Sequence, residues 1–274
     1  MKYSRLTVPR RAQDDALVGL LALHGPLGFL QDGADLVACF RSADAARAAR
    51  RTVQARGYRA AISTDLPEGD PLEAFRAASR PFPVGRRLWI DPGEPGGGSA
   101  PEGRLLLRLP ASRAFGTGGH ESTRLALLAL EDEVSGEERV LDAGTGSGVL
   151  ALAAVALGAR RAIGFDTDAD AVFVARENAR RHVFGGRAAF YAGGLDAESG
   201  RFAIVVANML PDESLPLLSA LAARVAPSGR LILSGIPAER EADVLAKARR
   251  RRLRLTARHR ENDWSCLCLA RASS

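Results

Sequence analysis

"VLDAGTGSGVL" (residues 140–150) joins an apolar run that ends at Asp142 to a second apolar run of helical length. Between the two runs, Gly144, Gly146 and Gly148 occupy alternate positions. Glycine is needed where the backbone turns tightly and a ligand lies against it. In open α/β sheets, ligands bind beyond the carboxyl ends of the strands. The stretch therefore predicts a strand, a cofactor-binding loop and a helix.

The spacing of these glycines bears on which cofactor binds. A dinucleotide fingerprint, G-x-G-x-x-G, counted from Gly144 places its third glycine at position 149, which is Val149. Asp142 stands just before the loop, where a negative charge suits a cationic ligand better than a diphosphate. S-adenosylmethionine (SAM) carries a sulfonium and an ammonium and no phosphate, so the pattern favours it. A nicotinamide dehydrogenase is the alternative enzyme class.

Polar residues follow two later apolar strands. In "AIGFDTD" (162–168) the strand ends at Asp166, just before Thr167, where an acid can accept hydrogen bonds from both ribose hydroxyls of NAD or SAM. In "AIVVANML" (203–210) the strand ends at Asn208, whose amide can orient an amine or the cofactor, or merely cap the strand. No adjacent prolines or aromatic residue follow Asn208, which disfavours a flat nucleobase substrate.

Residues 105–274 alternate apolar strands with helices, which predicts an α/β domain built on a doubly wound, Rossmann-like parallel sheet. The predicted strands are 139–142, 161–166, 188–192, 203–207 and 229–234. The predicted helices are 122–130, 149–157, 169–181, 216–225 and 238–250. The final stretch, 252–271, predicts two strands joined by a polar turn, so we expect the sheet to end in a hairpin.

The N-terminal region has a different pattern. Residues 1–64 predict the order β-α-β-β-α-β, a small ferredoxin-like α+β domain suited to recognition or packing. Residues 65–104 predict an interdomain linker with one short helix and one strand, and its Gly- and Pro-rich part, 93–103, predicts a flexible turn.

Composition limits the class of protein. With 46% hydrophobic and 26% charged residues, the chain of 274 residues has the composition of an ordinary globular protein. No apolar run reaches 18 residues and the start lacks the apolar region of a signal peptide, so we expect a cytoplasmic protein. The net charge of +6 fits an RNA or ribosomal partner, or the arginine usage of a GC-rich genome.

Cysteine and histidine give no sign of a metal site. Cys39, Cys266 and Cys268 have no zinc spacing, and we expect reduced thiols. The four histidines also lack ligand spacing. They are His24, His120, His182 and His259. We therefore expect no metal.

Four motifs together carry a resemblance to a known family. They are "AFGTGGHESTRLALLAL" (114–130), "VLDAGTGSGVLALAA" (140–154), "GFDTD" (164–168) and "VVANML" (205–210). In this order and spacing they resemble the ribosomal protein L11 methyltransferase (PrmA) family of class I SAM-dependent methyltransferases. The resemblance covers residues 105–240 well and the end of the chain more weakly. It implies methylation of lysine and N-terminal amines of ribosomal protein L11, with the N-terminal domain recognising the substrate.

The motifs and the resemblance together predict the site residues. The cofactor contacts are Phe115, Gly116, Thr117, Thr123, Asp142, Gly144, Gly146, Gly148, Asp166, Thr167 and Asn208. Residues 115–120 would close over the sulfonium as a lid, and the hydroxyl of Thr123 would meet the methionyl carboxylate. Asn208 and His120 are the candidate catalytic residues, with a capping or packing role as the alternative for His120. The basic stretch 247–260 is a candidate contact for ribosomal RNA, or a solvated helix face.

The chain departs from the family pattern on the substrate side. The family's D-W-x-x-x-W-K appears here as "DPLEAFR" (70–76), and the tryptophan that follows "RLWIDP" is replaced by "GEP" (93–95). The paired threonines appear as Ser122 and Thr123, which keeps the hydroxyls. The alternatives are therefore a methyltransferase acting on another protein lysine or a small amine, and a non-catalytic, SAM-binding, ribosome-associated module.

Overall fold

The computed structural model describes residues 3–9, 17, 20–21, 24–26, 28–32, 35–40, 42–66, 80–93, 98–110 and 119–272. The chain forms two compact units. The smaller contains residues 1–79 and 111–113, and the larger contains residues 80–110 and 114–274. Among the described residues, no helix is long and apolar enough to cross a membrane.

The smaller unit is built on a four-stranded antiparallel sheet in the order β2-β3-β1-β4. Its strands are β1 (Tyr3–Pro9), β2 (Gly28–Asp32), β3 (Asp35–Phe40) and β4 (Ala61–Leu66). Helical residues between β1 and β2, and α2 (Ala43–Gln54) between β3 and β4, complete the β-α-β-β-α-β order. Ser42 caps α2, and the helix buries Ala46, Ala49 and Val53 at helical spacing. The predicted ferredoxin-like arrangement is confirmed.

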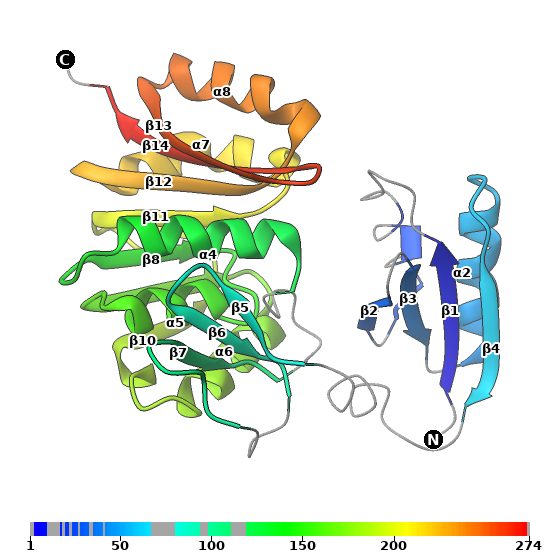
Figure 1. Ribbon diagram of the computed structural model, residues 1–274. Helices are drawn as coiled ribbons and strands as arrows, with labels where there is room; N and C mark the ends of the chain where they lie inside the picture. The colour runs from blue at the N-terminus through cyan, green and yellow to red at the C-terminus, as the bar shows by residue number, and fades with distance from the viewer. Residues whose placement is uncertain are drawn as a thin grey trace. The chain divides into compact units, whose positions relative to one another are not determined.

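The larger unit is built on a seven-stranded sheet in the order β10-β9-β8-β11-β12-β14-β13 (Figure 1). Five strands are parallel: β8 (Arg139–Ala143), β9 (Arg161–Asp166), β10 (Ala188–Ala192), β11 (Phe202–Asn208) and β12 (Val225–Pro237). The hairpin of β13 (Leu253–Glu261) and β14 (Trp264–Arg271) closes the sheet, with β14 antiparallel to β12. The parallel sheet and its terminal hairpin are as predicted.

Helices cover both faces of this sheet. The helices α4 (Glu121–Glu133), α5 (Val149–Leu157) and α6 (Ala169–Arg180) pack on one face, and α7 (Pro211–Arg224) and α8 (Glu241–Arg250) on the other. Successive residues of β8 divide between the two cores, Val140 on one face and Leu141 on the other, because side chains alternate along a strand. Both faces are buried, so the central strands are continuous apolar runs.

Among the predicted elements of the larger unit, α7 and β12 differ most from the sequence prediction in their boundaries. Helix α7 begins at Pro211, five residues before the predicted start at Pro216. Proline suits the first helical position, since the N–H that it lacks has no intrahelical partner there, and Pro216 is accommodated inside the helix. Strand β12 extends beyond the predicted 229–234 at both ends.

The predicted linker, 65–104, is corrected for residues 80–104, which belong to the larger unit. There β5 (Phe82–Val84), β6 (Leu88–Asp91) and β7 (Leu105–Arg108) form a three-stranded sheet. Its apolar residues join the core under α4 and α5. These strands have only three or four residues, too few for alternation to be distinguished from a linker with scattered apolar residues. The short helix was predicted without bounds, and residues 67–79 of the linker lie outside the described residues.

Candidate functional site

The glycine-rich loop lies at the carboxyl end of β8, in the centre of the larger sheet. Gly144, Gly146 and Gly148 all have positive φ, at 68°, 52° and 82°. Side-chain-bearing residues rarely adopt this conformation, so each of the three glycines is required by the backbone. Gly148 is also the N-cap of α5, and its Cα lies so close to α6 and β10 that a Cβ would meet Ala175 at 3.0 Å. The predicted strand–loop–helix is confirmed.

Asp142 is fully buried beneath this loop. Its Oδ2 accepts hydrogen bonds from Thr145 Oγ1 (2.6 Å) and from the backbone N–H of Ala151 (3.2 Å). Its Oδ1 is buried, and no described residue gives it a hydrogen-bond partner. Burial raises the pKa of Asp142 to about 6, against the two hydrogen bonds, which lower it, and the charge of Asp166 adds to the rise. An unpaired buried carboxylate oxygen is unstable unless a donor or a cation reaches it.

Asp166 ends the neighbouring strand β9 and faces the same loop. Its Oδ2 accepts from the backbone N–H of Gly146 and its Oδ1 from that of Asp168, each at 3.0 Å. Asp168 in turn caps α6, and Thr167 between them is exposed. The half-buried carboxylate of Asp166 is thus held in a fixed orientation at the sheet edge, next to the glycine loop.

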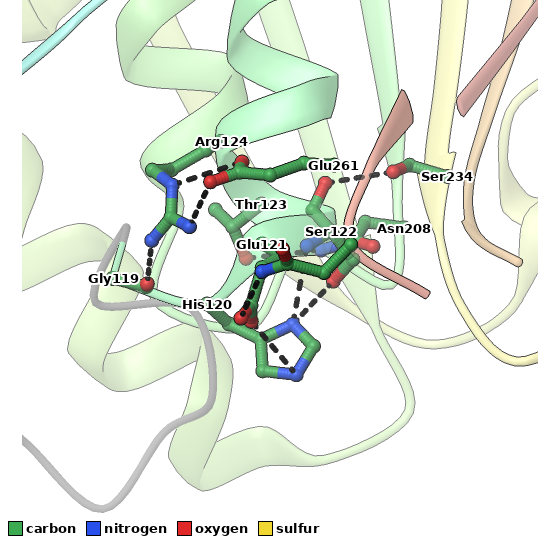
Figure 2. Close-up of polar contacts among 10 residues, drawn as sticks. Gly119, His120, Glu121, Ser122, Thr123, Arg124, Asn208, Ser234 and Glu261 are labelled. Carbon is green, nitrogen blue, oxygen red and sulfur yellow. Dashed lines mark hydrogen bonds and ion pairs between the residues drawn. The ribbon is translucent and has the colours of Figure 1, made fainter. Parts of the chain in front are cut away.

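The first turn of α4 supplies the third part of the site (Figure 2). Thr123 is fully buried there, and its Oγ1 accepts a hydrogen bond from Nδ2 of Asn208 at the end of β11 (3.1 Å). A strand-end asparagine and a helix-start threonine, predicted separately to contact the cofactor, therefore contact each other. The structure places both at the carboxyl edge of the sheet, and their contacts with the cofactor remain predictions.

His120 is the N-cap of α4. Its Nδ1 accepts a hydrogen bond from the backbone N–H of Ser122 (3.2 Å) and lies 2.8 Å from the Ser122 hydroxyl. Its ring meets that of Trp264 edge to face, with centroids 4.8 Å apart. These contacts support the capping and packing alternative for His120, since they occupy the side chain with structural interactions. A catalytic role stays a prediction.

Two residues that the sequence did not single out support this arrangement. Ser234, which lies opposite Asn208 in β12, is buried and donates from its hydroxyl to the carbonyl of Ser122 (2.7 Å). Gly235 follows with φ 78° at a bulge in β12, and a Cβ there would lie 2.6 Å from the carbonyl oxygen of Met209. The only sequence sign was their place at the end of a predicted strand.

Some predicted features lie outside the described residues. Phe115, Gly116 and Thr117 fall in 111–118, so only Gly119 and His120 of the predicted lid, 115–120, belong to the described residues. The departures from the family pattern at 70–76 and at positions 94 and 95 also lie outside the described residues. Within the described part of the chain, no group of three or more Asp, Glu, His or Cys side chains is placed to hold a metal ion.

The donor set fits a cationic cofactor without phosphates. Two carboxylates, Asp142 and Asp166, flank the loop, and within the described part of the chain nothing pairs with the buried Oδ1 of Asp142. The three glycines let the loop turn at positive φ, a backbone conformation in which a ligand can lie close to the chain. A ligand with a positive charge and a ribose diol matches these groups, whereas a pyrophosphate would meet like charges.

The strand order also defines the class. With its strands numbered along the chain, the larger sheet has the order 3-2-1-4-5-7-6 with strand 7 antiparallel, and the cofactor loop follows strand 1. This is the sheet of a class I SAM-dependent methyltransferase. The family model described as ribosomal protein L11 methyltransferase (PrmA) matches residues 29–272. The chain therefore belongs to the ribosomal protein L11 methyltransferase family of SAM-dependent enzymes.

Individual relatives agree with this assignment. The chain is 45% identical to the ribosomal protein L11 methyltransferase of Geobacter metallireducens and 48% identical to that of Geobacter sulfurreducens. Each match extends over 206 residues, which are 74% of this chain and 67% of the relative. A crystal structure of ribosomal protein L11 methylase from Lactobacillus delbrueckii subsp. bulgaricus is 28% identical, with a TM-score of 0.65, and covers 71% of this chain and all of that one.

Proposed function

We propose that this enzyme transfers the methyl group of SAM to amines of ribosomal protein L11, at lysine side chains, at the N-terminal amine, or at both. The observation that carries the proposal is the convergence of Asp142, Asp166 and the Thr123–Asn208 pair on one sheet edge. The similarity to the ribosomal protein L11 methyltransferases of the two Geobacter species supports the choice of substrate. A ribosomal substrate also implies action in the cytoplasm.

The chemistry requires a neutral amine. SAM supplies an electrophilic methyl group on a sulfonium, whose C–S bond breaks as the amine nitrogen forms the new C–N bond. An α-amine with a pKa of about 7.7–8.0 is about 10–15% neutral at pH 7, and a lysine of pKa about 10.4 is less than about 0.1% neutral. Deprotonating the lysine at pH 7 costs about 4–5 kcal/mol, which a desolvated pocket offsets by lowering the lysine pKa.

The side chains at the site have separate tasks in this proposal. Asp142 and Asp166 hold the cationic cofactor and its ribose. Thr123 fixes the amide of Asn208 by accepting one of its N–H groups. That contact orients the amide carbonyl oxygen, which can accept from the incoming amine and align its lone pair. Alignment of the two reactants is worth up to about 7–11 kcal/mol of the barrier.

Isothermal titration of SAM tests the cofactor half of the proposal. Wild-type protein is expected to bind SAM, and Asp166→Ala to bind at least about tenfold more weakly, since a charge-assisted hydrogen bond contributes about 1.5–3 kcal/mol. Asp132→Ala is the matched control, an exposed acid in the last turn of α4. Binding of NADH but not SAM by the wild type would contradict the proposal.

Methyl transfer tests the substrate half. Purified L11 and N-terminally acetylated L11 are incubated with SAM carrying a labelled methyl, and mass spectrometry locates the label. Label on unmodified L11 alone indicates the N-terminal amine, and label on both indicates lysine. If SAM binds and L11 stays unlabelled, the substrate is another protein lysine or a small amine, or the protein is a SAM-binding module without catalysis.

We further propose that any contact with ribosomal RNA involves only part of the basic stretch 247–260. Lys247 pairs with Asp243, and both Arg258 and Arg260 pair with Glu241. The exposed arginines at the end of α8 and the start of β13 are the better candidates. They are Arg249, Arg250, Arg252 and Arg254. Replacing these four by glutamine should reduce the salt dependence of binding to a ribosomal RNA fragment, and equal slopes would exclude the contact.

A further inference from the structure

The turn of the C-terminal hairpin contacts the first turn of α4. Glu261 and Trp264 face each other across the turn that joins β13 to β14, with Asn262 at φ 49°. Asn262 Nδ2 lies 3.4 Å from Glu121 Oε1, and the Trp264 ring meets the ring of His120. The hairpin thus reaches α4 where that helix carries Thr123.

Arg124 forms the centre of this contact. Its Nε and Nη2 donate to the two carboxylate oxygens of Glu261, and the Nε bond is 3.1 Å long. Its Nη1 donates to the carbonyl oxygen of Gly119, just before the helix (Figure 2). One planar guanidinium therefore joins the hairpin to the segment that leads into α4. A forked pair of this kind restricts orientation more than a single ion pair does.

The pair is not placed to contribute much to the stability of the fold. The side chains of Arg124 and Glu261 are 27% and 35% exposed, and ion pairs that water reaches contribute little to global stability. The neighbouring residue, Thr123, however, is fully buried and holds Asn208. A small rotation of the first turn of α4 would change that contact without unfolding the helix.

We propose that Arg124 and Glu261 are positioning residues for the methyl-transfer site, through which the C-terminal hairpin holds Thr123 and Asn208 in place for the cofactor. The proposal rests on the SAM site proposed above and not on the identity of the methyl acceptor. It assigns a function in the active site to the hairpin, although the cofactor loops lie on other strands.

The test compares SAM affinity with thermal stability in Glu261→Gln, Arg124→Lys and the double variant. Glu261→Gln removes the charge, and Arg124→Lys keeps the charge but removes the fork. Each single variant is expected to weaken SAM binding about tenfold, measured by titration calorimetry, with the melting temperature nearly unchanged. The double variant is expected to bind no more weakly than either single one, because both changes break the same contact.

The matched control is Glu133→Gln, which breaks the pair of Glu133 with Arg230 (3.3 Å) at the opposite end of α4. Those side chains have similar exposure, at 20% and 32%. SAM affinity within twofold of wild type in both Arg124→Lys and Glu261→Gln, or an equal loss in Glu133→Gln, would overturn the proposal. If wild-type protein binds SAM but methylates no L11, only the proposed substrate fails, since the affinity comparison needs no acceptor. If the wild type binds no SAM, both proposals fail.

Discussion

Asn208 Nδ2 donates to Thr123 Oγ1 across 3.1 Å, although 85 residues separate the two in the chain. Asn208 ends β11 and Thr123 lies in the first turn of α4, so the contact joins a strand end to a helix start at the carboxyl edge of the sheet. Neither side chain alone has a fixed amide or hydroxyl orientation. Together they present the Asn208 carbonyl oxygen in a defined direction.

Thr123→Val should therefore lower catalysis while keeping the fold. Valine has nearly the shape of threonine in this fully buried position but leaves the Asn208 N–H without its acceptor. We expect kcat/KM for methyl transfer to fall about 5- to 150-fold, which corresponds to about 1–3 kcal/mol for one donor, here half-buried, that loses its acceptor. Steady-state kinetics with labelled SAM measure the effect. Thr123→Ser keeps the hydroxyl and is expected to stay near wild type, and a valine variant with wild-type kinetics would show that the contact has no role in catalysis.

A pair of variants distinguishes a catalytic role of His120 from a helix-capping role. Asparagine can cap α4 as His120 does, whereas alanine cannot, and loss of a cap costs about 0.5–2 kcal/mol. From the capping contacts we expect His120→Asn to keep most of the methylation activity and of the stability in urea. His120→Ala should lose about 1 kcal/mol of stability. An asparagine variant that folds like wild type but is inactive would instead assign a catalytic role to the imidazole.

Much of the fold and the conformation of the glycine-rich loop follow from local sequence pattern. The doubly wound parallel sheet was predicted without its strand order, because buried parallel strands are continuous apolar runs with helices between them. Gly144, Gly146 and Gly148 were predicted as loop residues, and all three have positive φ. In such cases the residues that determine a local conformation lie in the same short stretch that adopts it.

Features that depend on distant contacts could not be predicted in this way. The place of Ser234 follows from its register opposite Asn208 and its bond to Ser122, which lies 112 residues away. The role of His120 as a cap depends on where α4 begins, and helix boundaries are the least reliable part of a sequence prediction. The strands β5 and β7 were not predicted, because each has only three or four residues. Their apolar residues are recognisable as parts of a sheet only from their packing under α4 and α5.

Gly235→Ala should destabilise the fold at a position next to the site. A Cβ at this position would lie 2.6 Å from the backbone oxygen of Met209, and the backbone has φ 78°. Left-handed strain of about 1–2 kcal/mol and a clash of about 1–3 kcal/mol predict a loss of about 2–5 kcal/mol in the free energy of unfolding. Gly103→Ala has the same φ of 78° with open space around it, so urea denaturation of the two variants isolates the clash. Equal losses in both would show that Met209 moves aside freely.

The charge of Asp142 should make the free protein less stable as pH rises. Its folded-state pKa of about 6 lies above the ordinary value of 3.8, so between these pH values the folded state binds more protons than the unfolded state. Stability from this group is thus complete at low pH and falls as pH rises from about 4 to 6. The difference of about two pKa units corresponds to about 3 kcal/mol. The free energy of unfolding is measured by urea denaturation from pH 4 to 7 for wild type and Asp142→Asn. The difference between the two proteins isolates the contribution of Asp142, because all other titrating groups are the same.

Ligand binding should have the opposite pH dependence. A cationic cofactor needs the Asp142 carboxylate, so SAM affinity of the wild type is expected to fall up to tenfold for each pH unit below about 6. Asp142→Asn is expected to bind SAM weakly at every pH, although it should not share the loss of stability toward neutral pH. A wild type whose SAM affinity is flat between pH 5 and 7 would mean that the carboxylate does not face the cation. An asparagine variant that binds like wild type would lead to the same conclusion, and Oδ1, which has no partner among the described residues, would then have no part in cofactor binding.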